Sequence, residues 1–187
     1  MAIRDNIQVF RGEDRTLRFS VIDANIQTKV RDGGDGIDEV QTTISVVSTA
    51  GFASSGRGKL DDEIFSYTGI TTTSFTGVAR GAAQVFGAIF GATPHNEGTI
   101  IYAVPDVTGW TTELDVRETG ATAASIITDK VGSSPSVVNG LIDISIVNAD
   151  TEAQTPDTYV YGFTRIDTGS NTVLAHGAFV ISQEVTR

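Results

Sequence analysis

The 187-residue sequence contains no cysteine, one tryptophan, one methionine and two histidines. The missing cysteine excludes thiol catalysis, cysteine-ligated zinc and disulfide bonds, and two histidines leave little material for imidazole chemistry. No hydrophobic run approaches the roughly 20 residues of a membrane-spanning helix. Residues 1–18 mix charges throughout, unlike a signal peptide. We therefore expect no membrane partner, no cofactor and no enzymatic activity.

Basic side chains are also scarce. The sequence contains 13 Lys and Arg residues and 23 Asp and Glu residues, which gives a formal net charge of −10. Binding to DNA, RNA or anionic lipid depends on cationic side chains that displace counterions. This balance therefore argues against a nucleic-acid partner. A chain of this length can bury a core large enough to fold without a metal or a disulfide.

The apolar residues that are present follow a two-residue period, which predicts half-buried strands. Alternating runs occupy 17–21, 110–116, 142–146 and 173–182, and Trp110 is expected in the core. Clusters of Gly, Asp, Asn and Ser separate the runs, at 32–36, 51–58, 132–136 and 167–171. Short strands punctuated by such turns predict an all-β sandwich or barrel.

Helical patterning is weak. One helical turn is expected at 148–153, and a second short helix at 78–90. Long alternating strands mark the two outer segments, whereas the middle is more irregular and richer in glycine. We predict a discontinuous β-sandwich domain formed by 1–30 and 103–187, with a small β domain inserted at 37–102.

An aspartate-rich loop at 31–39 raises the question of calcium. Asp32, Asp35 and Asp38 are the candidate ligands, because hard cations bind several oxygens from one flexible loop. The spacing does not match the twelve-residue EF-hand pattern. The alternative is a solvated linker in which Gly and Asp form turns.

Neither histidine has a catalytic signature, since no metalloprotease-like or triad-like spacing accompanies His95 or His176. His95 is expected in a turn, and His176 on a strand. The acidic groups at 61–63 and 150–152 leave general acid–base catalysis open, because a sequence does not show the separation of two carboxylates. The glycine-rich run at 51–58 lacks the Gly-Lys-Ser/Thr ending of a phosphate-binding loop.

The run Val-Phe-Gly-Ala-Ile-Phe at 85–90 is the most apolar feature of the middle segment. Exposed apolar patches usually mark interfaces. Val85, Phe86, Ile89 and Phe90 are therefore the candidates for contact with a neighbouring subunit, and the alternative is that they fill a core.

Several motifs of the outer segments resemble a small β-sandwich of tailed-bacteriophage proteins, similar to the N-terminal domain of the siphophage baseplate upper protein. They include Arg-Gly-Glu-Asp at 11–14, Val-Thr-Gly-Trp at 107–110, Gly-Leu-Ile-Asp-Ile at 140–144 and Pro-Asp-Thr-Tyr-Val-Tyr at 156–161. The resemblance implies an immunoglobulin-like or Greek-key sandwich. It also implies that Tyr159 or Tyr161 ties the corner before a strand to upstream backbone.

The middle segment resembles a second motif of phage virion proteins. The matching stretches are Glu-Ile-Phe-Ser-Tyr-Thr-Gly at 63–69, Phe-Thr-Gly-Val-Ala-Arg-Gly at 75–81 and His-Asn-Glu-Gly at 95–98. The link at 82–92 is longer and more apolar than is usual in that motif. Neither resemblance carries catalytic residues.

Together the resemblances imply a structural protein of a tailed-phage virion, an assembly or adaptor module of the tail or baseplate that works through subunit contacts. Its partners would be other virion proteins and copies of itself, and its location would be the phage particle, assembled in the cytoplasm of the bacterial host. A capsid cement or head-decoration protein is the alternative. A carbohydrate-binding module or an enzyme is the alternative of another class.

Overall fold

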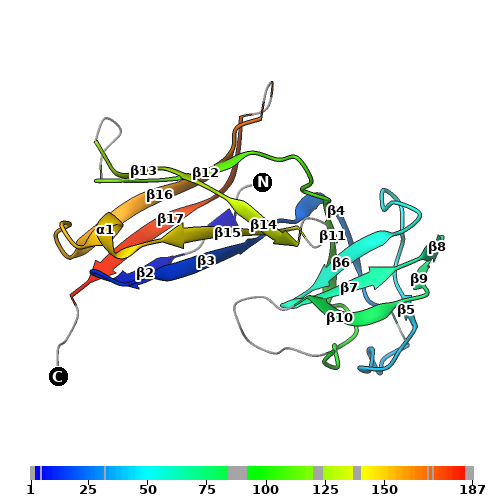
Figure 1. Cartoon of the computed structure of the whole chain (residues 1–187). Helices are drawn as coiled ribbons and strands as arrows, with labels where there is room; N and C mark the ends of the chain where they lie inside the picture. The colour runs from blue at the N-terminus through cyan, green and yellow to red at the C-terminus, as the bar shows by residue number, and fades with distance from the viewer. Residues whose placement is uncertain are drawn as a thin grey trace. The chain divides into compact units, whose positions relative to one another are not determined.

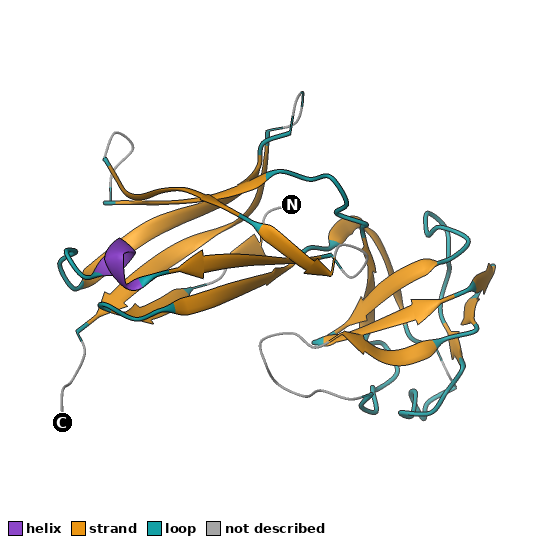
Figure 2. Ribbon diagram, in the orientation of Figure 1, coloured by secondary structure: helices purple, strands orange, loops and turns teal. Residues whose placement is uncertain are grey.

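A computed structural model of the chain describes residues 3–4, 6–31, 33–83, 92–119, 124–136, 140–167, 169 and 171–183. Strands dominate these residues, with one helical turn among them (Figures 1 and 2). The all-β, sandwich-type fold expected from the two-residue period is confirmed. Within the same described residues, no helix has the length and apolarity needed to cross a membrane.

The chain divides into two compact units. Unit 1 comprises residues 1–19, 108–135 and 142–187, and unit 2 comprises residues 20–107 and 136–141. Unit 2 therefore interrupts unit 1 in the sequence.

Unit 1 is built on two sheets. The larger has the order β1 (Ile3–Arg4), β17 (Thr172–Ser182), β16 (Asp157–Arg165), β12 (Thr112–Arg117) and β13 (Ser125–Val131), and β2 (Ile7–Phe10) also pairs with β17. The smaller has the order β14 (Ser133–Ser136), β15 (Leu141–Ile146) and β3 (Arg15–Ser20).

Alternate residues of these strands form the core of unit 1. On β16 the buried positions are aromatic, and on β15 they are Leu141 and three isoleucines. Phe19 of β3 stacks on Phe163 of β16, with ring centroids 4.2 Å apart, so the two sheets contact each other through their apolar faces. The buried apolar side chains of unit 1 are Val9, Leu17, Leu114, Val116, Ile127, Ile142, Ile144, Ile146, Tyr159, Tyr161, Phe163, Ala175, Phe179 and Ile181.

The motif at 11–14 contacts α1 (Asn148–Thr151), the helical turn that the sequence predicts. The amide of Gly12 donates to the hydroxyl of Thr151 at 2.9 Å, and the side-chain amide of Asn148 donates to the carbonyl of Gly12 at 2.7 Å. The backbone amide of Asn148 donates to Asp14 at 2.6 Å. These contacts tie together segments that lie more than a hundred residues apart in the sequence, so here the motif residues hold the fold.

The tyrosine corner is also present, and it belongs to Tyr159. Its hydroxyl donates to the carbonyl of Thr155, four residues upstream, at 2.7 Å. This contact decides between the two tyrosines that the resemblance left open, and it fixes the loop that enters β16.

Tyr159→Phe is expected to lower the free energy of unfolding of unit 1 by about 1 kcal/mol, because it removes one hydrogen bond and nothing else. Urea unfolding followed by the fluorescence of Trp110, the only tryptophan and a residue of unit 1, measures the loss. Thr155→Ala is the control, since it keeps the accepting carbonyl. Equal stability of Tyr159→Phe and wild type would contradict the assignment.

Unit 2 contains a five-stranded and a three-stranded sheet. The first has the order β10 (Ala79–Ala83), β7 (Glu63–Tyr67), β6 (Gly56–Leu60), β11 (Ile100–Val104) and β4 (Asp23–Lys29), and the second has the order β5 (Thr43–Ser45), β9 (Ser74–Thr76) and β8 (Gly69–Thr71). The core holds an aromatic cluster in which the ring of Phe75 lies 4.7–5.6 Å from those of Phe52, Phe65 and Tyr67.

The boundaries of the units differ from those expected. Residues 20–30 and 103–107 were assigned to the outer domain, but they lie in unit 2, because β4 and β11 pair with each other and β11 pairs with β6. Alternation runs on from β3 toward β4 without a change in composition, so nothing in the sequence marks the boundary at Ser20. Residues 136–141 also lie in unit 2.

The helix expected at 78–90 is wrong for residues 79–83, which form β10 and pair with β7. Gly81 has φ +65°, which a right-handed helix does not contain. The remainder of the predicted helix, 84–90, lies outside the described residues.

Candidate functional site

Glu63 is the first residue of β7, and it lies on the same face of the strand as Phe65 and Tyr67, which are core residues. Its side chain is only 1% exposed. A buried carboxylate that lacks partners costs several kcal/mol. The neighbourhood of Glu63 is therefore the first place to look for a functional group.

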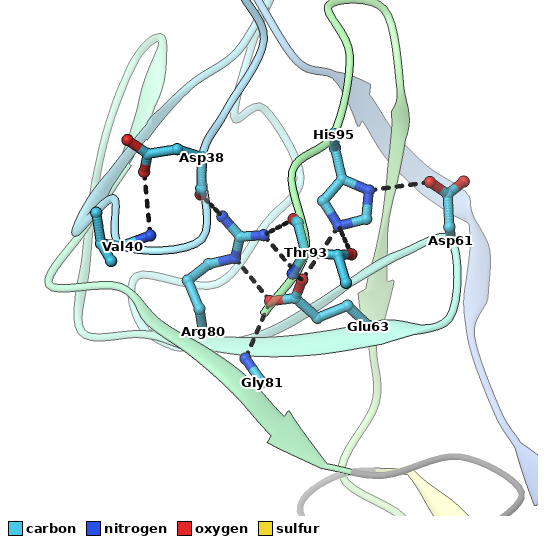
Figure 3. A network of polar contacts seen from close by, with 8 residues as sticks. All are labelled: Asp38, Val40, Asp61, Glu63, Arg80, Gly81, Thr93 and His95. Carbon is cyan, nitrogen blue, oxygen red and sulfur yellow. Dashed lines mark hydrogen bonds and ion pairs between the residues drawn. The ribbon is translucent and has the colours of Figure 1, made fainter. Parts of the chain in front are cut away.

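Arg80 of β10 forms a bidentate ion pair with Glu63 (Figure 3). Its Nε lies 2.6 Å from Oε1 of Glu63, and its Nη2 lies 2.8 Å from Oε2. The guanidinium also donates to the backbone carbonyls of Asp38 and Thr93. With a side chain 4% exposed, Arg80 is as inaccessible as its partner, so the pair is a buried one.

Two backbone amides complete the coordination of the carboxylate. Gly81 donates to Oε1 at 2.9 Å, and Thr93 donates to Oε2 at 3.2 Å. Glu63 therefore holds residue 81 and residue 93 at one point.

His95 adds a second carboxylate to the group. Its Nε2 lies 3.1 Å from Glu63 Oε2, and its Nδ1 lies 3.0 Å from Oδ2 of Asp61. The backbone of His95 exchanges two hydrogen bonds with Ile37, at 2.8 and 2.9 Å, which brings the loop at 33–39 against the same group. We call Asp61, Glu63, Arg80 and His95 the Glu63 cluster.

Burial alone would raise the pKa of Glu63, but the hydrogen bonds from Arg80, His95 and the amides of Gly81 and Thr93 outweigh it. They lower the pKa from 4.5 to about 2. The carboxylate is therefore charged at neutral pH and carries no proton that it could give to a substrate.

This lowered pKa predicts a pH dependence of stability. The stabilisation from ionised Glu63 is complete above pH 4.5, its ordinary value, and is lost as the pH falls toward 2. The advantage in unfolding free energy of wild type over Glu63→Gln should therefore shrink by about 3 kcal/mol between pH 6 and pH 2. Urea unfolding of both proteins at several pH values tests this, and a difference independent of pH would contradict it.

Together with Thr93, the cluster places a hydroxyl, an imidazole and a carboxylate in sequence, as in a nucleophilic triad. Thr93 Oγ1 lies 3.4 Å from His95 Nε2, and Asp61 lies beyond Nδ1. The same Nε2 faces Glu63 at the shorter distance of 3.1 Å. A ring N–H that points at a carboxylate does not accept the proton of a hydroxyl. The arrangement thus suits a clamp better than a nucleophile with its base.

Sequence reasoning did not bring this cluster together. The sequence predicts His95 in a turn and leaves the acidic group at 61–63 open as a possible acid–base pair. Asp61 and Glu63 do converge, but on His95, and Glu63 is committed to Arg80. One feature of the sequence does indicate the cluster. Glu63 alternates with Phe65 and Tyr67 on the inward face of a strand, and a buried charged residue requires a polar partner.

The calcium candidates do not form a site among the described residues. Asp35 and Asp38 are exposed, and a carboxylate oxygen of Asp38 accepts the amide of Val40 at 3.0 Å in a local turn. Asp32 lies outside the described residues. Within those residues, no group of three or more His, Asp or Glu could hold a metal ion.

The interface candidates Val85, Phe86, Ile89 and Phe90 also lie outside the described residues.

In unit 1, His176 is exposed on β17, and Asp150 pairs with Lys130 at 2.6 Å.

Trp110 is not the core residue that was expected. It is half-buried, and the guanidinium of Arg165 lies over its ring at 4.0 Å from the centroid, held there by Asp167. Arg165 occupies one face of the ring by a cation–π contact. That face is therefore not open to stack on a sugar.

No protein-family model matches the chain, and none of the curated proteins compared with it is similar to it.

Proposed function

We propose that this chain is a structural protein of a tailed-phage virion, an assembly or adaptor module of the tail or baseplate that acts through contacts between subunits. The observation that carries the proposal is the internal use of the motif residues. In the middle motif, Glu63, Arg80, Gly81 and His95 bind one another. In the outer motifs, Gly12 and Asp14 bind the α1 turn, and Tyr159 binds its own corner.

Residues that serve chemistry keep at least one reactive atom free for a substrate. Both oxygens of Glu63 accept two or more donors, and the guanidinium of Arg80 spans Glu63 and two carbonyls. Such saturation favours a rigid framework over a reacting centre. A rigid module of this kind would work by burying complementary surface, on the order of 1,000 Å² or more for a stable contact.

Immunogold electron microscopy tests the proposal. Antibodies raised against the purified chain are applied to phage particles produced by the bacterium that encodes it, and particles from a strain lacking the gene serve as the control. Label at the tail or baseplate is the expected result. Label spread over the head would replace the tail assignment with the head-decoration alternative. Absence of label from particles, with the chain in the soluble lysate, would overturn the proposal.

A further inference from the structure

The five-stranded sheet of unit 2 has two chemically different faces. Gly58, Leu60, Phe65 and Ile101 point into the core. The opposite face carries Arg57 and Lys59 of β6, Tyr102 of β11 and Lys29 of β4, because alternate residues of a strand point to opposite sides. Ile64 of β7, opposite Lys59, lies on this face too and is buried in a small cluster with Leu141.

The strand register groups three cations around one aromatic ring. Lys59 lies directly opposite Tyr102. Arg57 pairs with Val104, one row away along β11, and Lys29 pairs with Ile100, one row away in the other direction. Neighbouring rows on one face are about 7 Å apart. Arg57, Lys59 and Lys29 thus flank Tyr102, and we call these four residues the cationic face.

These cations, like Arg31 of the same unit, have no ion pair among the described residues. Arg80 is saturated by Glu63, whereas Arg57, Lys59 and Lys29 have no hydrogen bond or ion pair to another described residue. Lys59 is half-buried. Burial lowers the pKa of Lys59, and the charge of nearby Asp62 only partly opposes this. An uncompensated, partly desolvated ammonium is stabilised by a carboxylate from outside.

A pocket of about 660 Å³ opens beside Arg57 within unit 2. Its lining includes the hydroxyl-bearing Ser55 and Ser66, the apolar Val104 and Pro105, and the carboxylate of Asp23. One oxygen of Asp23 is already engaged by the amide of Asn25, at 3.0 Å. Asp106 also lines the pocket, so two carboxylates face the one guanidinium there, and an acidic side chain is drawn to the cationic face and not into the pocket.

Unit 2 also carries the complementary charge. The Ile37–His95 backbone pairing brings the loop at 33–39 beside residues 95–98, and the carboxylate of Glu97 lies next to Gly34. Asp35, Glu39 and Glu97 are exposed there. We call these three residues the acidic loop.

We propose that the cationic face of one copy binds the acidic loop of a second copy of this chain. Charge complementarity argues for this occupant, since the exposed Lys29 and the half-buried Arg57 and Lys59 are opposite in sign to the exposed carboxylates of the acidic loop. The inference rests on the proposed structural role and names its partner.

Sedimentation analysis of the full chain over a range of concentrations tests the inference. Wild type is expected to self-associate, and the dissociation constant should rise at least tenfold between about 0.05 M and about 0.3 M salt, as screening weakens the contact. Arg57→Glu with Lys59→Glu should abolish association, and so should Asp35→Lys with Glu97→Lys. An equimolar mixture of these two variants should associate again, because each presents the charge that the other lacks.

Arg11→Glu with Arg117→Glu is the control: it changes the net charge equally, at exposed sites of unit 1, and should leave the association of wild type largely intact. Circular dichroism confirms that each variant folds. A wild type that stays monomeric at low salt would overturn the inference, as would a variant mixture that stays monomeric. Binding of heparin or single-stranded DNA to the cationic face without self-association would also overturn it, in favour of a polyanion. None of these results would change the particle labelling, which tests the structural role separately.

Discussion

Arg80→Ala should lower the free energy of unfolding of unit 2 by about 3–5 kcal/mol, because it strands the carboxylate of Glu63 in a site that water does not reach. Glu63 is 1% exposed, and it would keep only His95 and two backbone amides as partners. Amide hydrogen exchange of peptides from unit 2 measures the loss, since exchange reports the stability of each region separately.

Arg18→Ala is the matched control for this variant. Arg18 forms an equally well-aligned pair with Asp143, with both N–O distances 2.7 Å, but its side chain is 30% exposed. Removing it should cost no more than about 1 kcal/mol. A double variant, Glu63→Leu with Arg80→Met, should recover most of the loss, because it buries no unpaired charge. Equal costs for Arg80→Ala and Arg18→Ala would contradict the account of the Glu63 cluster.

Gly36→Ala should destabilise unit 2 by about 3–5 kcal/mol, well beyond the usual effect of a single added methyl group. Gly36 has φ +77°, a conformation that costs a residue with a Cβ about 1–2 kcal/mol. In addition, a Cβ at this position would lie 2.2 Å from the backbone oxygen of His95, which is held by its hydrogen bond to Ile37. Backbone that takes part in such a pairing does not move aside without breaking it.

Gly33→Ala separates the two contributions. Gly33 has the same φ of +77°, but a Cβ there would meet no atom within 4 Å. Its substitution should therefore cost only the conformational part, about 1–2 kcal/mol. Thermal unfolding and hydrogen exchange of both variants give the comparison. If the two substitutions lower the free energy of unfolding equally, the close contact between Gly36 and the backbone of His95 does not hold the loop in place.

The strands of unit 1 were predictable because their order is local. Alternation along 142–146 and 173–182 needs only neighbouring residues to be read, and the buried positions at Ile142, Ile144, Phe179 and Ile181 follow it. The same locality explains the error at 79–83. That segment has small residues and no clear period, and only its pairing with β7 makes it a strand.

The Glu63 cluster was not predictable in the same way. Its members come from four places in the chain, at 61, 63, 80 and 95, and the contacts among them span up to 34 residues. Glu63, Arg80, Gly81 and His95 all belong to the motif that resembles phage proteins. No periodicity in the sequence shows that these residues contact one another. The cationic face was not predictable for a related reason, since its charges come from two strands, β6 and β4, which are brought together only by their pairing with β11.

Quantitative mass spectrometry of purified phage particles tests the central claim most directly, namely that this chain serves as a building part and not as a reacting centre. The account predicts that the chain stays with the particles through a high-salt wash and a density gradient, at a fixed number of copies relative to the tail proteins. Loss of the chain from washed particles, or fewer than one copy per particle, would contradict it.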